Sequence, residues 1–280
     1  MNEQISKNYL SIGQSIGLLA ITLAVTIFLS PIMFLKGIIG AEATTFLFYL
    51  VTMGLSFWIL FSIWKNKSDD YSFSYKVPKG IIIPVILLGT LGIQLSLTIP
   101  LSSLIPMSDE FAELFKQSLG NPRNIFTFTT IVVLAPVLEE LIFRGIILKG
   151  LLKRYSPATA IAASSVLFGV VHLNPWQFIS ALILGIFIGW VYYRTRSISL
   201  AIIIHAFNNF TATLPEIIGI DESKYDHTHL RELIMTDIKY TLIIGGAAVV
   251  AAACIYVLNK RLKQVPTPTA ARVEGNKANF

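Results

Sequence analysis

Residues 131–148 read Ile-Val-Val-Leu-Ala-Pro-Val-Leu-Glu-Glu-Leu-Ile-Phe-Arg-Gly-Ile-Ile-Leu. Three ionisable side chains, Glu139, Glu140 and Arg144, therefore interrupt an apolar run that is long enough for a membrane-spanning helix. Ionisable groups are costly inside a bilayer, so their presence there indicates a functional site. The stretch predicts a helical membrane protein with chemistry in its core.

The composition of the whole chain agrees with this prediction. Hydrophobic residues make up 54% of the 280 residues, charged residues only 14%, and the mean hydropathy is +0.68. Ordinary soluble domains contain about 25% charged residues. The net charge of +6 is explained by basic loops on one side of a membrane, because no basic patch is interleaved with aromatic residues. We expect membrane lipid, and no nucleic acid, as a partner.

The apolar segments predict an all-α, polytopic integral membrane protein of about eight transmembrane helices, with the active site inside the helix bundle. The segments lie near residues 13–35, 43–64, 81–105, 124–149, 157–173, 177–193, 197–218 and 238–258. The fifth and sixth are short and separated only by Asn174-Pro175, so a re-entrant hairpin there would leave seven spans. We expect one membrane domain over residues 1–263, with its motif-bearing core at about 124–215, and a disordered cytoplasmic tail over residues 264–280.

The distribution of Lys and Arg predicts the topology. With eight spans and the N-terminus inside, fifteen basic residues fall in inside segments and six in outside segments, while Arg144 lies in the membrane. Basic residues concentrate on the cytoplasmic side of membranes. We therefore expect both termini to be cytoplasmic. The absence of an organellar address in the sequence favours a bacterial plasma membrane.

The spacing of Glu139, Glu140 and Arg144 predicts different roles for the two glutamates. Glu140 and Arg144 are four residues apart and can pair on one face of a helix. Glu139 lies about 100 degrees around the helix from Glu140, so the arginine does not neutralise it directly. Pro136 removes one backbone hydrogen bond of the same helix. We expect a structural Glu140–Arg144 ion pair and a Glu139 carboxylate that is free for proton chemistry.

Two histidines in other apolar segments add acid–base groups. Phe168 lies one helical turn before His172 and can shield this imidazole from lipid. Asn209 lies one turn after His205, where an amide can fix the tautomer of the ring or donate to an oxyanion. Histidine titrates near neutral pH, which makes it a ready acid–base partner for Glu139.

The three pairs form an ordered set of motifs. Glu-Glu-x-x-x-Arg at 139–144, Phe-x-x-x-His at 168–172 and His-x-x-x-Asn at 205–209 resemble the motifs of the CAAX prenyl endopeptidase and bacteriocin-processing family, called CPBP or Abi. The resemblance covers residues 124–215. It implies a glutamate-type intramembrane endopeptidase that cleaves a membrane-associated or lipidated peptide, by CAAX-type or bacteriocin leader processing.

The resemblance also implies a role for each motif residue. Glu139 would be the general base that activates water, and Glu140 with Arg144 would hold the site together. His172 would orient the water, and His205 with Asn209 would stabilise the oxyanion. Apart from the resemblance, we expect Phe168 to bind the substrate.

Three other functions remain open from the sequence. Glu139, His172 and His205 would serve as ligands in a zinc endopeptidase, although the sequence lacks His-Glu-x-x-His and a metal-free mechanism is favoured. The same three residues would form a relay in a proton-coupled transporter. A non-catalytic immunity scaffold would retain the motifs without using them.

Overall fold

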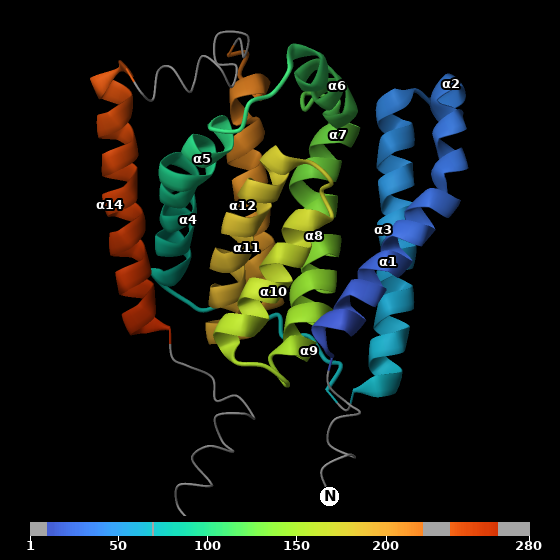
Figure 1. Cartoon of the computed structure of the whole chain (residues 1–280), viewed down its shortest axis with the longest axis horizontal. Helices are drawn as coiled ribbons and strands as arrows, with labels where there is room; N and C mark the ends of the chain where they lie inside the picture. The colour runs from blue at the N-terminus through green and yellow to red at the C-terminus, as the bar shows by residue number, and fades with distance from the viewer. Residues whose placement is uncertain (1–9, 69, 221–235, 263–280) are drawn as a thin grey trace, which may run out of the picture.

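The computed structural model describes residues 10–68, 70–220 and 236–262 as a bundle of upright helices (Figure 1). Within this part of the chain six helices are long and apolar enough to cross a membrane. They are Ile12–Ile39 (α1 Ile12–Phe28, η2 Ser30–Leu35 and α2 Lys36–Ile39), α3 Ala41–Lys67, Ile82–Ser103 (α4 Ile82–Ile93, η3 Gln94–Thr98 and α5 Ile99–Ser103), α11 Pro175–Thr195, α12 Ile198–Ile217 and α14 Ile238–Arg261. The expected all-α polytopic membrane fold is confirmed.

The other two predicted spans are also helical. Residues 125–151 form one helical run whose hydrogen bonds change to the wider π pattern in η4 and η5. Its parts are α7 Ile125–Thr129, η4 Thr130–Leu134, α8 Ala135–Glu140, η5 Leu141–Leu148 and α9 Lys149–Leu151. The next helix, α10 Pro157–Val170, has 14 residues and is about 21 Å long. It ends short of the roughly 30 Å hydrocarbon core of a bilayer.

A tight turn joins α10 to α11 at Asn174-Pro175, where the sequence predicted one. Leu173 adopts a positive φ of 56°. The Asn174 side chain then accepts a hydrogen bond from the Gln177 backbone N–H at 2.8 Å, and Pro175 fills the first helical position. These local signals reverse the chain and return α11 alongside α10.

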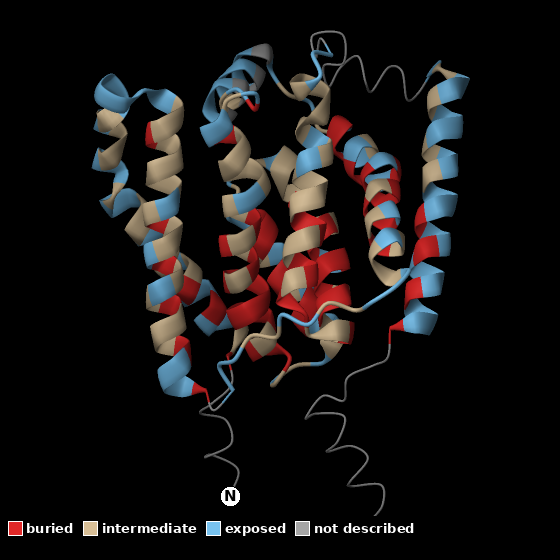
Figure 2. Cartoon of the chain, turned by 180° about the vertical axis from the view of Figure 1, so that it is seen from behind, coloured by how far each residue is buried: buried red, intermediate tan, exposed pale blue. Residues whose placement is uncertain are grey.

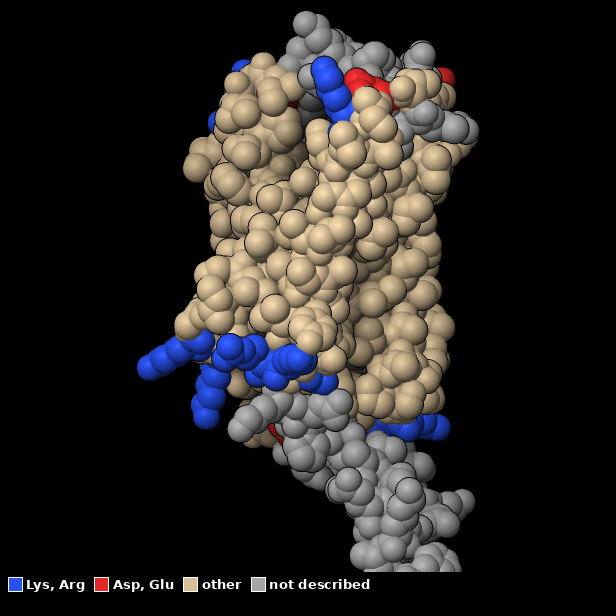
Figure 3. Space-filling view, turned by 90° about the vertical axis from the view of Figure 1, so that its left-hand side faces the viewer, with Lys and Arg blue, Asp and Glu red and all other residues tan. Residues whose placement is uncertain are grey.

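Basic side chains gather at one end of the bundle, the end at which residues 10 and 262 also lie (Figures 1 and 3). We call it the basic end. Its described basic residues are Lys65, Lys67, Lys76, Lys79, Lys149, Lys153, Arg154, Arg194, Arg196, Lys260 and Arg261. The predicted tail 264–280 and the predicted loop residues Lys7, Lys224, Arg231, Lys263, Arg272 and Lys277 lie outside the described residues. That the basic end faces the cytoplasm stays a prediction.

The core lies in the half of the bundle next to the basic end, where buried residues are concentrated (Figure 2). All residues from Ile142 to Leu148 in η5 are buried. The segment 70–80 crosses the basic end from α3 toward α4. Lys149 fixes it by donating hydrogen bonds to Asp70 Oδ1 at 2.7 Å and to the Ser72 carbonyl at 2.5 Å. Lys149 of α9 thereby ties this segment to the helical run that carries Glu139 and Glu140.

A short helix lies outside the predicted spans. α6, Asp109–Leu119, sits at the end of the bundle opposite the basic end (Figure 1). Phe111 packs against Trp176 with ring centroids 4.7 Å apart, and the Trp176 indole donates to the Ile105 carbonyl at 3.0 Å. These contacts tie α6 and its loop to the start of α11.

Candidate active site

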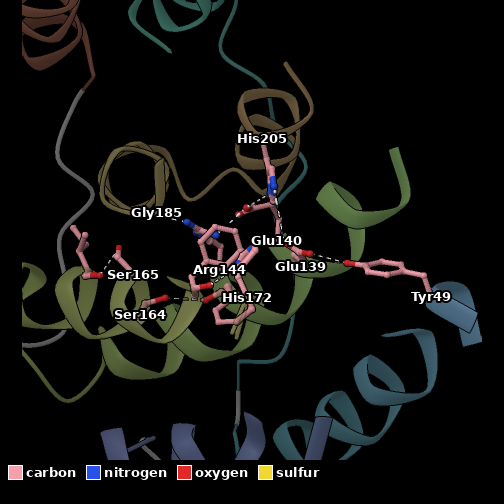
Figure 4. A network of polar contacts seen from close by, with 12 residues as sticks. Tyr49, Glu139, Glu140, Arg144, Ser164, Ser165, His172, Gly185 and His205 are labelled. Carbon is pink, nitrogen blue, oxygen red and sulfur yellow. Dashed lines mark hydrogen bonds and ion pairs between the residues drawn. The ribbon is translucent and has the colours of Figure 1, made fainter. Parts of the chain in front are cut away.

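Glu140 is the centre of a buried network (Figure 4). Its side chain is completely buried, and Oε1 accepts hydrogen bonds from Arg144 Nη1 at 2.8 Å and from His205 Nδ1 at 2.8 Å. The predicted i, i+4 ion pair is therefore present. The histidine contact was not predicted, because the sequence suggested Glu139 as the partner of the imidazoles. One carboxylate oxygen thus joins η5 and α12 to the end of α8.

Arg144 is 1% exposed and is held from three sides. Its Nη2 donates to the Gly185 carbonyl in α11 at 3.2 Å, and its Cζ lies 4.7 Å from the centroid of the Phe168 ring. Among the described residues, Arg144 Nε and Glu140 Oε2 have no hydrogen-bond partner. The arginine therefore connects three helices while its charge is matched by Glu140.

Phe168 lies between the two histidines. Its ring makes edge contacts with His172 at 5.3 Å and with His205 at 5.5 Å between centroids. The prediction of a substrate contact does not fit this placement, because only 1% of Phe168 is exposed and the ring has almost no surface left for a ligand. The side chain packs against the motif residues instead.

Glu139 has a different environment from its neighbour. Its side chain is 15% exposed, and Oε1 accepts a hydrogen bond of 2.6 Å from the Tyr49 hydroxyl in α3. Oε2 lies 3.9 Å from His205 Nε2, which is too long for a direct hydrogen bond. As expected from the helical geometry, Arg144 is paired with Glu140 and not with Glu139.

Both histidines are held through Nδ1. The His172 ring is half-buried just beyond the end of α10, and its Nδ1 lies 2.8 Å from the Phe168 carbonyl. Carbonyl and carboxylate oxygens only accept, so Nδ1 is the donor in His172 and in His205. In a neutral ring this leaves Nε2 as an acceptor. Both imidazoles are therefore fixed in one tautomer.

Asn209 fixes α12 against the helix that carries the glutamates. Its Nδ2 donates to the Ile131 carbonyl at 2.9 Å. In the i to i+5 pattern of η4 the partner of that carbonyl would be the N–H of residue 136, but Pro136 has none. Asn209 thus replaces a backbone donor that the proline removes, and it makes this bond rather than one to His205.

The site contains one polar side chain that sequence reasoning missed. Tyr49 lies 90 residues before Glu139 and outside the motif segment. Its only signal in the sequence is a hydroxyl group in an apolar span. The Gly185 carbonyl was missed too, since backbone acceptors leave no pattern in a sequence.

The described side chains of the site do not form a metal-binding group. Within residues 10–68, 70–220 and 236–262, no three His, Cys, Asp or Glu side chains form a group that could hold a metal ion. His205 Nε2 lies 3.9 Å from Glu139 Oε2, but His172 does not complete a group of three with them. The three residues suggested as zinc ligands are therefore not arranged as a metal site here.

Comparison with known proteins agrees with the motifs. Residues 121–211 match the family described as type II CAAX prenyl endopeptidase Rce1-like. No curated protein and no solved structure matches the chain significantly. The matched range contains all six motif residues and Phe168, and it confirms the resemblance to the CPBP family. Residues 121–211 are thus similar to the type II CAAX prenyl endopeptidase Rce1-like family.

Proposed function

We propose that this protein is an intramembrane endopeptidase in which Glu139 activates a water molecule to hydrolyse a peptide bond. One observation carries the assignment. Glu139 is a partly exposed carboxylate without an arginine partner, next to a fully buried carboxylate that has one. A general base must be able to take a proton, and a carboxylate bound to a cation is a weaker base.

The surrounding groups fit the steps of hydrolysis. Glu139 takes a proton from water, whose oxygen attacks the carbonyl carbon of the substrate, and His172 Nε2 accepts the second hydrogen bond of that water. The second amide proton of Asn209 stabilises the tetrahedral oxyanion, one helical turn from the His205 ring that Glu140 anchors through Nδ1. Glu139 then delivers its proton to the leaving amine, and the C–N bond breaks. Two new chain ends are the products.

The other motif residues keep this arrangement rigid. Arg144 and Phe168 are too deeply buried to touch a substrate, so we assign them to positioning. Asn209 has two amide protons and uses one for Ile131, which leaves the second for the oxyanion. Catalytic groups lose effectiveness steeply when they are displaced by about 1 Å.

The family match and the location of the site support a proposal for the substrate class. A site among membrane helices takes a peptide that is itself membrane-associated or lipidated, as CAAX-type or bacteriocin leader processing would provide. We propose a bacterial plasma membrane location with the basic end on the cytoplasmic side, in agreement with the concentration of Lys and Arg there.

Cleavage of fluorogenic membrane-anchored peptides by purified protein tests the proposal. Wild type and Glu139→Gln are compared with and without a zinc chelator. We expect wild-type cleavage that is indifferent to the chelator and a loss of at least about 100-fold in Glu139→Gln. Chelator sensitivity with recovery on added zinc would favour the metalloprotease. Full activity in Glu139→Gln would remove the assignment.

A further inference from the structure

The hydroxyl of Tyr49, which lies outside the matched family segment, donates a hydrogen bond to Glu139. We propose that Tyr49 is a positioning residue that holds the Glu139 carboxylate in a fixed orientation. The inference rests on the proposed role of Glu139 as the base. It makes α3 a necessary part of a site whose motif residues all lie within 121–211.

The length of the contact indicates its nature. Tyr49 Oη and Glu139 Oε1 are 2.6 Å apart. Hydrogen bonds from a hydroxyl to an ionised carboxylate are typically about 2.5–2.7 Å long, shorter than those to neutral acceptors. The 2.6 Å distance is compatible with an ionised acceptor, and the tyrosine brings no positive charge to Glu139.

This neutral donor distinguishes the two adjacent glutamates. A carboxylate in a membrane span is costly without compensation. Glu140 is compensated by the charge of Arg144, whereas Glu139 is compensated by a single hydroxyl and partial exposure. Glu139 thereby keeps its negative charge available for a proton from water.

The hydrogen bond from Tyr49 makes the two carboxylate oxygens of Glu139 inequivalent. Oε1 is occupied by Tyr49, while Oε2 points toward His205 Nε2 at 3.9 Å (Figure 4). The oxygen on the histidine side is the one left to receive the proton. Fixing one oxygen also limits rotation of the carboxyl group, which keeps the other oxygen in place.

Aromatic packing holds α3 in position for this contact. Phe46, three residues before Tyr49 and near it on the helix surface, packs against Phe126 of α7 with ring centroids 5.7 Å apart. Figure 4 shows the Tyr49 side chain reaching from α3 to Glu139 on the neighbouring helix. The tyrosine is thus supplied by a helix that is docked beside the site.

The test uses the full-length chain with Tyr49→Phe, which removes only the hydroxyl. We expect kcat to fall by about 10- to 100-fold, with KM within about twofold, as for loss of a hydrogen bond to a charged group. Tyr256→Phe is the control, since this tyrosine lies on α14 and is 60% exposed.

The outcomes separate this inference from the proposed function. Activity is compared on the folded fraction from gel filtration, so a loss of folded protein is not counted as a loss of catalysis. If Glu139→Gln is inactive while Tyr49→Phe keeps wild-type kcat and KM, the positioning role is overturned and the proposed function stands. If Glu139→Gln is fully active, the proposed function falls, and with it the role of Tyr49.

Discussion

His205 Nδ1 lies 2.8 Å from Glu140 Oε1, although 65 residues separate the two in the chain. The contact joins α12 to α8 at the level of the motif residues. It gives the buried carboxylate a second donor beside Arg144 and turns the other ring nitrogen of His205 toward Glu139. Glu140 therefore positions the groups around Glu139, the proposed general base.

Replacing Glu140 should damage both stability and activity. Glu140→Gln removes the negative charge and leaves Arg144 as a buried, uncompensated cation. We expect a loss of about 3–5 kcal/mol in the free energy of unfolding, together with loss of cleavage. Denaturant titration of the purified protein in detergent measures the first effect. Glu139→Gln is the matched control, and equal stability losses in both variants would contradict the assignment of the structural pair to Glu140.

Asn209 and Pro136 should be coupled. Asn209→Ala leaves the Ile131 carbonyl without its donor and should cost about 1–3 kcal/mol. Pro136→Ala restores a backbone N–H close to that carbonyl, so the double variant should lose less stability than the sum of the two single changes. A double-mutant cycle of unfolding free energies measures the difference. Additive losses would show that the carbonyl does not depend on Asn209.

The segment that crosses the basic end should loosen in acid. Burial raises the pKa of Asp70, but the hydrogen bond and charge of Lys149 outweigh it and hold that pKa below its usual value. A lowered folded-state pKa stabilises the protein above the unfolded-state value of about 3.9 and loses this effect as pH falls through the folded-state value. The melting temperature of wild type should therefore exceed that of Asp70→Asn at about pH 7, and the difference should vanish once the pH falls below the lowered folded-state pKa. A difference independent of pH would contradict this account.

Close packing of α14 should depend on a glycine. A Cβ on Gly92 would lie 3.0 Å from the Ala247 carbonyl oxygen and 3.0 Å from the Ala251 nitrogen, both backbone atoms of α14. Gly92→Ala should therefore separate α4 from α14 and cost about 1–3 kcal/mol of unfolding free energy. Gly54→Ala is the control, because a Cβ there meets nothing within 4 Å. Similar stability in the two variants would show that the α4–α14 contact adapts freely.

Hydrophobic periodicity and residue spacing in the sequence were sufficient to predict the local features of the structure. The eight apolar segments appear as helices at the predicted places, and Asn174-Pro175 forms the predicted turn. The Glu140–Arg144 pair follows from residues four apart on one helix. These features depend on interactions between near neighbours in the chain, which a sequence displays directly.

The sequence by itself determined that the chain is helical, membrane-spanning and equipped with three motifs on separate helices. Only the tertiary structure decided that His205 binds Glu140, that Phe168 is enclosed rather than free for substrate, and that Tyr49 reaches Glu139. The physical reason is that these contacts join helices far apart in the chain. Which side chains meet depends on how the helices pack and rotate against one another. The periodicity of the sequence does not encode this packing.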